Sequence, residues 1–312
     1  MISTLLTILP VFALIFIGWC VRRRGLLGPH ATGELNRFVV YLALPALLFD
    51  IVSRARLSEI WQPGFIATFG LSCFLLFALT LAFRWWRSKH LADSAIDALG
   101  AAYANTGFLG FPLALAVFGP EAMAPTLIAT ILTVCAIFAV AIVAIEVGLQ
   151  KEQRLGRLAW KTSGSLARNP LLLAPLLGAV FPIFELPVPA AIGSLAKLLG
   201  GAASPCALVG LGLFLAEKRQ VESHQCGPAT VLIACKLLVQ PLAAWWLATQ
   251  VFRLPGTLPQ QAVLLAALPT GTGPFMLAEF YHRHAAMTSR IIIVSTALSV
   301  MTLAIYITYG IR

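Results

Sequence analysis

The stretch NTGFLGFP (Asn105–Pro112) interrupts an otherwise apolar segment that runs from about Ala98 to Phe118. Its two glycines loosen the backbone, and Pro112 lacks an amide donor and clashes with the preceding turn of a helix. In a bilayer, irregular backbone is tolerated only where it is buried in protein or lines a cavity, because each unpaired polar group costs several kcal/mol. The stretch therefore predicts a broken membrane helix and a candidate binding site.

A second break of the same kind, PTGTGP (Pro269–Pro274), lies inside the apolar segment from about Leu258 to Phe280. Each half of the chain therefore contains one interrupted helix. Paired Gly/Pro-interrupted segments at corresponding positions are typical of the substrate site of transporters built from inverted repeats. The half-helices that resume after Gly107 and Gly271 would present free N–H groups and a partial positive charge to an anion.

Composition places the chain among multi-pass membrane proteins. Hydrophobic residues make up 59% of the 312 residues, charged residues only 11%, and the mean hydropathy is +0.89. Soluble domains are about 45–50% apolar and about 25% charged. The net charge of +10 is spread over short loops, which argues against a nucleic-acid-binding domain. The six cysteines are scattered without paired spacing, so they predict neither a metal site nor a disulfide framework.

Apolar runs and basic loops together predict the topology. We expect ten spanning segments, at about residues 2–21, 35–53, 63–83, 95–118, 124–149, 169–184, 189–215, 228–251, 259–280 and 288–310. The loops after the odd-numbered segments hold most of the 22 Lys and Arg residues. Because cytoplasmic loops carry the Lys and Arg excess, both termini are predicted to lie outside the cytoplasm, in a bacterial inner (cell) membrane.

A weak internal repeat predicts two copies of opposite orientation. The matching positions are Pro10 with Pro170, Gly18 with Gly178, and Pro45 with Pro205, in addition to the two breaks. We expect one five-helix repeat over residues 1–155 and a second, inverted five-helix repeat over residues 156–312. The basic loop Gln150–Arg168 would join them.

Several motifs resemble the auxin efflux carrier family, and the resemblance spans nearly the whole chain. They are YLALPALLF (41–49), the first break (105–112), NPL (169–171), KLLVQP (236–241), ALPT (267–270) and STALS (295–299). The resemblance implies an all-α integral membrane protein of ten helices in two inverted five-helix repeats, with broken helices four and nine crossing at the substrate site. It also implies a scaffold of helices one, two, six and seven that forms a homodimer. Helices three to five and eight to ten would form a transport domain that moves like an elevator.

The second break, in the form TGTGPFM, looks most like the malonate carriers of the bacterial branch of this family. Many relatives have an asparagine in the second break, whereas this chain has Gly273 followed by Pro274. The absence of a long central loop also favours a bacterial metabolite carrier over a plant auxin exporter. The resemblance therefore implies a secondary active transporter of a malonate-like dicarboxylate. An exporter of auxin-like or other monocarboxylates is the alternative.

The candidate substrate-binding residues lie in the two breaks, together with one lysine inside the eighth segment. They are Asn105, Thr106, Gly107, Pro112, Lys236, Pro269, Thr270, Gly271 and Thr272. The Asn and Thr side chains would bond a carboxylate, or they would satisfy backbone groups that the breaks leave unpaired. Lys236 would be a counter-charge for the anion, or it would snorkel or pair with a backbone carbonyl.

Other polar residues have both structural and functional interpretations. Tyr103 would line the pocket or pack in the core, and Asp97 could titrate during transport. Ser295 and Ser299 share one helix face and could bond a neighbouring helix. No HExxH, GxSxG or GxxxxGK motif is present, so we expect no enzyme, cofactor or metal. An anion channel or a ligand sensor is the alternative of another class; the expected partners are an organic anion, protons and the bilayer, not nucleic acid.

Overall fold

The computed structural model describes residues 2–55, 61–150, 167–217 and 226–311. Within these ranges the chain is helical, and the one strand-like pairing is an antiparallel bridge between Ala104 and Thr270. Six helices are long and apolar enough to cross a membrane: Ala31–Ser53, Pro63–Ser88, Pro120–Leu149, Ala190–Ala216, Gly227–Val251 and Ala285–Tyr309. The chain is therefore an all-α multi-pass membrane protein. The ten-helix inverted repeat stays a prediction, and its boundary between residues 155 and 156 lies outside the described residues.

Many of the helices are built from shorter pieces. The first half contains α1 (Ile2–Arg23), α2 (Ala31–Phe38), η1 (Val39–Ala43), α3 (Leu44–Ser53), α5 (Pro63–Ser88), α6 (Leu91–Ala102), η2 (Thr106–Gly110), α7 (Phe111–Phe118), η3 (Pro120–Ala122), α8 (Met123–Thr130), η4 (Ile131–Ile137) and α9 (Phe138–Leu149). The second half contains α11 (Pro170–Ile183), α12 (Ala190–Ala216), α13 (Cys226–Ala234), η6 (Cys235–Val239), α14 (Gln240–Trp246), η7 (Leu247–Val251), α15 (Leu258–Ala266), α16 (Gly273–Phe280) and α17 (Ala285–Tyr309).

The η elements are π-helical turns, except η3, which is a 3₁₀ turn. Three of the π turns come directly before a helix with proline in its first turn, namely Pro45 in α3, Pro112 in α7 and Pro241 in α14. Proline removes one backbone hydrogen bond and collides with the carbonyl group four residues earlier. A wider turn at that point lets the helix continue without the collision.

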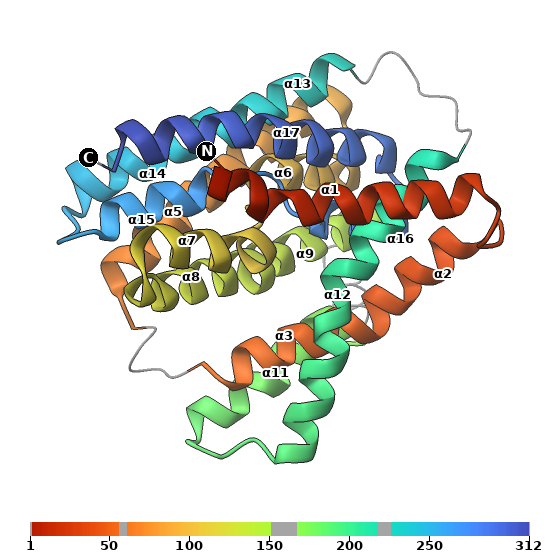
Figure 1. Ribbon diagram of the computed structural model, residues 1–312, viewed down its shortest axis with the longest axis horizontal. Helices are drawn as coiled ribbons and strands as arrows, with labels where there is room; N and C mark the ends of the chain where they lie inside the picture. The colour runs from red at the N-terminus through yellow and green to blue at the C-terminus, as the bar shows by residue number, and fades with distance from the viewer. Residues whose placement is uncertain (1, 56–60, 151–166, 218–225, 312) are drawn as a thin grey trace.

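The helices form two groups. In Figure 1, α3, α11 and the lower part of α12 form a lobe below a larger layer that contains α5 to α9 and α13 to α17. The lobe is closely packed, since α3 contacts both α11 and α12. Above it, α12 also contacts α1 and α2. At Gly18 and Gly212 an added Cβ would overlap backbone carbonyl oxygens, those of Val209 and Ile15. Small residues of this kind let membrane helices approach each other closely.

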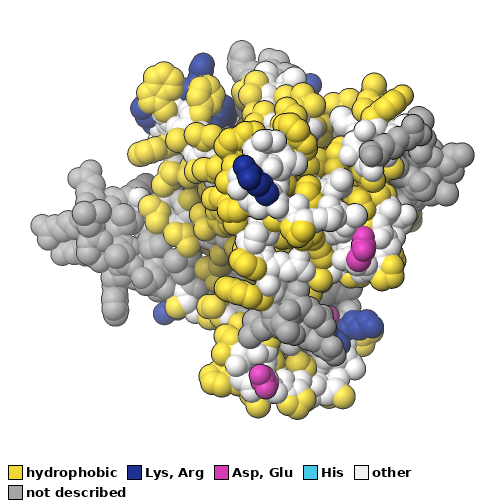
Figure 2. All heavy atoms as spheres, turned by 90° about the vertical axis from the view of Figure 1, so that its left-hand side faces the viewer, with side chains coloured by type: hydrophobic (Ala, Val, Ile, Leu, Met, Phe, Trp, Pro, Cys, Tyr) yellow, Lys and Arg dark blue, Asp and Glu magenta, His cyan; other side chains and the backbone are white. Residues whose placement is uncertain are grey.

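The surface of the molecule is apolar. Figure 2 shows one face on which hydrophobic side chains cover most of the area and charged side chains are scattered. Leu79, Leu198 and Trp61 are among the large hydrophobic side chains that are more than two thirds exposed, at 68%, 77% and 75%. Such exposure agrees with a bilayer as the surrounding solvent.

Candidate functional site

The two predicted breaks meet in the middle of the larger helix group. The first half-helix of each pair ends just before its break, α6 at Ala102 and α15 at Ala266. The extended residues beyond these ends then pair with each other. The N–H of Asn105 donates to the carbonyl of Pro269 at 2.9 Å, and the N–H of Gly271 donates to that of Tyr103 at 3.1 Å. Each break therefore satisfies part of the other's backbone.

After the breaks, both helices resume at slightly different residues from those predicted. The first helix starts again at Thr106, not after Gly107, because the carbonyl of Asn105 accepts hydrogen bonds from Leu109 and Gly110 in a π turn. The second starts again at Gly273, one residue later than predicted, with Thr272 as its N-cap. The extended part of the first break is therefore Tyr103 to Asn105, and Pro112 lies inside the resumed helix.

The glycines of the second break make room for one aromatic ring. An added Cβ at Gly271 would lie 2.8 Å from Cε1 of Tyr103, and one at Gly273 would lie 2.7 Å from its Cζ. The Tyr103 ring also packs against Phe138, with 5.8 Å between ring centroids. A larger residue at either glycine would push the two breaks apart, because aromatic and backbone atoms already occupy the space.

Two side chains of one helix bond the carbonyl ends of both first half-helices. The Lys236 ammonium donates to the carbonyl of Ala266 at 2.7 Å, at the end of α15. The Gln240 side-chain amide donates to the carbonyl of Ala102 at 3.3 Å, at the end of α6, and to the sulfur of Cys73 at 3.0 Å. Lys236 and Gln240 are fully buried. They therefore partner carbonyl groups that helix ends leave without intrahelical bonds.

Thr270 also bonds within the protein. Its hydroxyl donates to the carbonyl of Gly100 at 2.8 Å, and its N–H donates to the Ser295 hydroxyl at 3.2 Å. Thr270 and Ser295 are both fully buried. These polar groups therefore satisfy backbone groups at the break, and a substrate contact of Thr270 stays a prediction.

A cavity of about 240 Å³ lies between the crossing and the lobe that contains α3 and α12. The crossing contributes Tyr103, Ala104, Asn105, Gly107, Phe108, Thr272, Gly273 and Met276. The opposite wall and one side consist of Leu44, Leu47, Val134, Gly200, Gly201, Ala203, Ser204 and Pro205. None of these described lining residues carries a charge.

The cavity is lined in part by residues at two helix starts. Gly107 and Phe108 occupy the first turn of the helix that resumes after Asn105, where backbone N–H groups lack a carbonyl one turn earlier. Thr272 and Gly273 begin α16 in the same cavity. The side chain of Asn105 makes no capping bond to its own helix. The positive ends of two half-helices therefore face one small cavity.

The structure separates the predicted site residues into two sets. Asn105, Gly107 and Thr272 line the cavity. The remaining six lie at the crossing or behind it and do not line the cavity: Thr106, Pro112, Lys236, Pro269, Thr270 and Gly271. The buried hydroxyl of Thr106 has no hydrogen-bond partner among the described residues.

The wall that faces the crossing contains none of the residues predicted from the sequence to bind substrate. Ser204 and Pro205 lie midway along α12, and Leu44 and Leu47 lie on α3. A signal for this wall was present, since Pro205 is the repeat partner of Pro45 and follows a serine inside an apolar helix. Tyr103 was named as a residue that lines the pocket or packs in the core, and it does both, with 6% of its surface exposed.

A second cavity, polar and of about 850 Å³, is lined by residues of α2 and α16 and by the ends of α1 and α12. Tyr41 and Phe280 line it, and their rings contact each other edge to face with 5.6 Å between centroids. One helical turn deeper, Leu44 and Met276 line the first cavity. The contact between Tyr41 and Phe280 therefore lies one helical turn from residues that line the small cavity at the crossing.

Asp97 belongs to an ion-pair cluster at the start of α6. Its carboxylate lies 2.7 Å from the guanidinium of Arg84 and 2.9 Å from Nδ1 of His284. Asp93, one turn earlier, lies 2.9 Å from Arg283 and 4.0 Å from Nε2 of His284. The hydrogen bond with Asp97, together with the charges of both carboxylates, raises the pKa of His284, although burial and Arg84 oppose this. The cluster ties the loop after α16 to the first half-helix of the other pair.

Crossed, broken helices around a small cavity inside an apolar helical protein define the class of multi-pass membrane transporters. The family model described as "Membrane transport protein" matches residues 3–307. The chain therefore belongs to this family of membrane transport proteins, to which the auxin efflux carriers are related. Its relatives are named as transporters, and this chain is likewise a transporter and not an enzyme.

Three relatives illustrate the range of this family. A Rhizobium meliloti (strain 1021) protein named "Putative malonate transporter" is 32% identical over 300 residues, covering 95% of this chain and 92% of the relative. An "Uncharacterized transporter" of Methanothermobacter thermautotrophicus is 29% identical, covering 96% of each chain. Auxin efflux carrier component 3a of rice is 30% identical over 158 residues, which cover 49% of this chain and 25% of the carrier.

The contact between Lys236 and Ala266 predicts a structural effect of mutation. Lys236→Met leaves the Ala266 carbonyl buried without its partner, which costs about 1–3 kcal/mol. We expect a lower melting temperature and an equal weakening of dicarboxylate and monocarboxylate transport. Lys197→Met, at an exposed lysine of α12, is the control and should change neither. Loss of dicarboxylate transport alone would instead assign Lys236 as the counter-charge of the substrate.

The Asp97 cluster predicts a pH dependence of stability. Because the pKa of His284 is raised above its ordinary value of about 6.5, its protonated form stabilises the fold fully below about pH 6.5. This stabilisation is lost as the pH rises through the folded-state pKa. We expect His284→Gln to flatten the decrease in melting temperature as the pH rises above about 6.5. His282→Gln, at the exposed neighbouring histidine, should keep the wild-type slope; equal slopes for all three proteins would contradict the prediction.

Proposed function

We propose that this chain is a secondary active transporter of small organic anions in a bacterial inner membrane, and that the cavity at the crossing binds the substrate. The observation that carries the proposal is the convergence of two half-helix starts and the Asn105 side chain on one cavity. Each helix start contributes about 0.3–1 kcal/mol to anion binding, and about 2 kcal/mol in buried geometries. The Asn105 amide adds a hydrogen bond to a carboxylate oxygen.

A malonate-like dicarboxylate is the substrate class that we favour. The cavity, at about 240 Å³, is smaller than the roughly 300–1,000 Å³ of pockets for drug-sized ligands, so it suits a small acid. Two separate positive helix ends match an anion with two carboxylates. The name of the Rhizobium meliloti relative also supports malonate.

The transport cycle that we propose is an elevator movement coupled to protons. The cavity lies between a compact lobe, with α3 and α12, and the crossed helices, so sliding one against the other would carry the substrate across the bilayer. The lobe, together with α1 and α2, would be the scaffold of helices one, two, six and seven, which would also form the homodimer. Both termini would lie outside the cytoplasm. Of the nine residues expected to bind substrate, Asn105, Gly107 and Thr272 would touch it, and the other six would hold the crossing in shape.

A monocarboxylate is the second candidate, and the composition of the cavity wall supports it. Leu44, Leu47, Phe108 and Met276 give the cavity an apolar side without any basic residue. An aromatic acid such as indole-acetate would place its ring there and its single carboxylate at the helix starts.

Uptake by the purified protein in liposomes distinguishes these substrates. We expect saturable uptake of labelled malonate that increases with an inside-alkaline pH gradient and decreases in excess unlabelled malonate. Unlabelled succinate, malate and indole-acetate serve as competitors. Absence of malonate uptake, with saturable uptake of labelled indole-acetate in the same liposomes, would replace the dicarboxylate with the monocarboxylate.

Asn105→Ala tests the binding site in the same liposomes. Loss of one hydrogen bond to a charged carboxylate, about 1.5–3 kcal/mol, predicts an affinity that is lower by roughly tenfold to one hundredfold. Gly227→Ala is the control, because nothing lies within 4 Å of an added Cβ at Gly227. Unchanged malonate affinity in a folded Asn105→Ala protein would place the substrate elsewhere.

Cross-linking tests the elevator movement. In a protein without its native cysteines, Tyr41→Cys with Phe280→Cys should be joined by a reducible dithiol-reactive linker across the two helix groups. We expect uptake to stop on linking and to return on reduction. The control is Phe49→Cys with Phe181→Cys, whose rings lie 5.7 Å apart within the lobe on α3 and α11. Undiminished uptake by the linked Tyr41–Phe280 pair would argue against sliding.

A further inference from the structure

A lipid-facing groove lies between α5 and the helix formed by α13 and η6, away from the crossing. Its volume is about 570 Å³, and its apolar wall includes Leu76, Leu79, Val231 and Val239. Leu79, Val231 and Val239 are 68%, 57% and 48% exposed. An elongated apolar chain would therefore contact the groove along its length.

One end of this groove carries positive charge. Arg84 and Arg87 line it at the end of α5. Arg84 is paired with Asp97 at 2.7 Å. Arg87 is exposed, makes no ion pair with the described residues, and lies over the Phe83 ring at 5.9 Å from its centroid. This guanidinium is therefore available to an anion that approaches from the surface.

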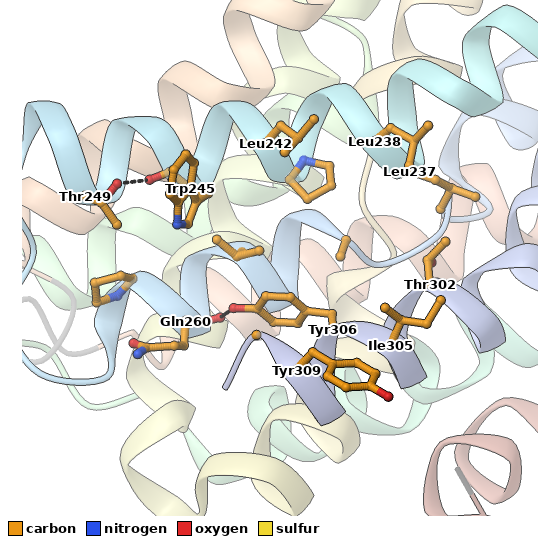
Figure 3. Close-up of a pocket in the computed structure, with 15 residues that line it drawn as sticks. Leu237, Leu238, Leu242, Trp245, Thr249, Gln260, Thr302, Ile305, Tyr306 and Tyr309 are labelled. Carbon is orange, nitrogen blue, oxygen red and sulfur yellow. Dashed lines mark hydrogen bonds between the residues drawn. The ribbon is translucent and has the colours of Figure 1, made fainter. Parts of the chain in front are cut away.

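The larger groove in Figure 3 differs from the groove at α5 in having no charged residue in its described wall. It has a volume of about 710 Å³, lies among α14, α15 and α17, and includes Trp245 and Tyr306 in its wall. None of the described residues that line it is charged, and the Tyr306 hydroxyl is already bonded to the Gln260 carbonyl at 3.0 Å. Nothing in that groove selects a headgroup. The groove at α5 combines an apolar wall with a cation at its end, Arg87, that forms no ion pair with the residues that the structure describes.

We propose that the groove between α5 and α13 binds one anionic phospholipid, with an acyl chain along Leu79, Val231 and Val239 and the phosphate on Arg87. Arginine binds phosphate oxygens with paired hydrogen bonds, and basic pockets between membrane helices on the cytoplasmic side select acidic headgroups. The cytoplasmic position of Arg87 rests on the proposed topology. The Trp85-Trp86 pair and Lys89, which flank Arg87 in the sequence, belong to the interfacial region where such headgroups lie.

Native mass spectrometry of the purified full-length protein tests this site without reference to transport. The protein is titrated with phosphatidylglycerol and, separately, with phosphatidylcholine of the same acyl chains. We expect one phosphatidylglycerol to be retained and phosphatidylcholine to bind at least fivefold more weakly. Arg87→Gln should lower phosphatidylglycerol binding to about the level of phosphatidylcholine binding. One basic residue near an anionic surface contributes about a fivefold effect on binding.

Two matched controls locate the effect. Arg23→Gln removes an arginine that likewise lies over an aromatic ring, Trp19, at 5.3 Å, but outside the groove. Val231→Trp fills the groove, whereas Leu71→Trp changes an exposed residue of α5 that does not line it. We expect Arg87→Gln and Val231→Trp to weaken phosphatidylglycerol retention, and the two controls to retain it. Equal binding of both lipids, or equal losses in Arg87→Gln and Arg23→Gln, would overturn the proposal even if malonate uptake were confirmed.

Discussion

The structure depends on one constraint, which is that the carbonyl groups at the ends of two broken helices must find partners where no water is present. Lys236 and Gln240 provide these partners for α15 and α6, from a single helix that carries both side chains. A lysine inside a membrane is costly unless it faces protein and pairs with an acceptor. Here it bonds the negative end of a helix, so its charge offsets the same dipole that the break exposes.

Lys236 and Gln240 bond the carbonyl ends of α15 and α6, whereas the N–H ends of η2 and α16 lie at the cavity. The antiparallel bridge between Ala104 and Thr270 holds the two breaks together, and glycines at 271 and 273 let Tyr103 pack at the crossing. The result is a small cavity with helix starts on one side and the wall of α3 and α12 on the other. Partial charges of helix ends attract an anion without the strong binding of a full salt bridge, and a transporter must also release its substrate.

The charged side chains of the helix group that carries the crossing are located mainly near the helix ends. The buried Asp97 carboxylate is paired with Arg84 and His284, which link α5, α6 and the loop after α16. This cluster therefore joins the start of α6, in one broken helix, to the loop that follows α16, in the other. The apolar exterior leaves the lipid in contact with Leu, Val and Trp side chains, and a groove with Arg87 at its end departs from that pattern.

The sequence by itself determined the membrane class, the two interrupted helices and the family, because hydropathy, Gly/Pro breaks and motif identity are local properties of the chain. It also identified Asn105, Gly107 and Thr272, which line the cavity. It did not determine the length of the first break. A π turn before Pro112 accommodates the proline within the helix, so the helix restarts at Thr106. Only the tertiary structure decided that Lys236 bonds Ala266 and that Ser204 faces the crossing. Which way a buried side chain points depends on contacts between residues far apart in the chain, and no local pattern encodes them.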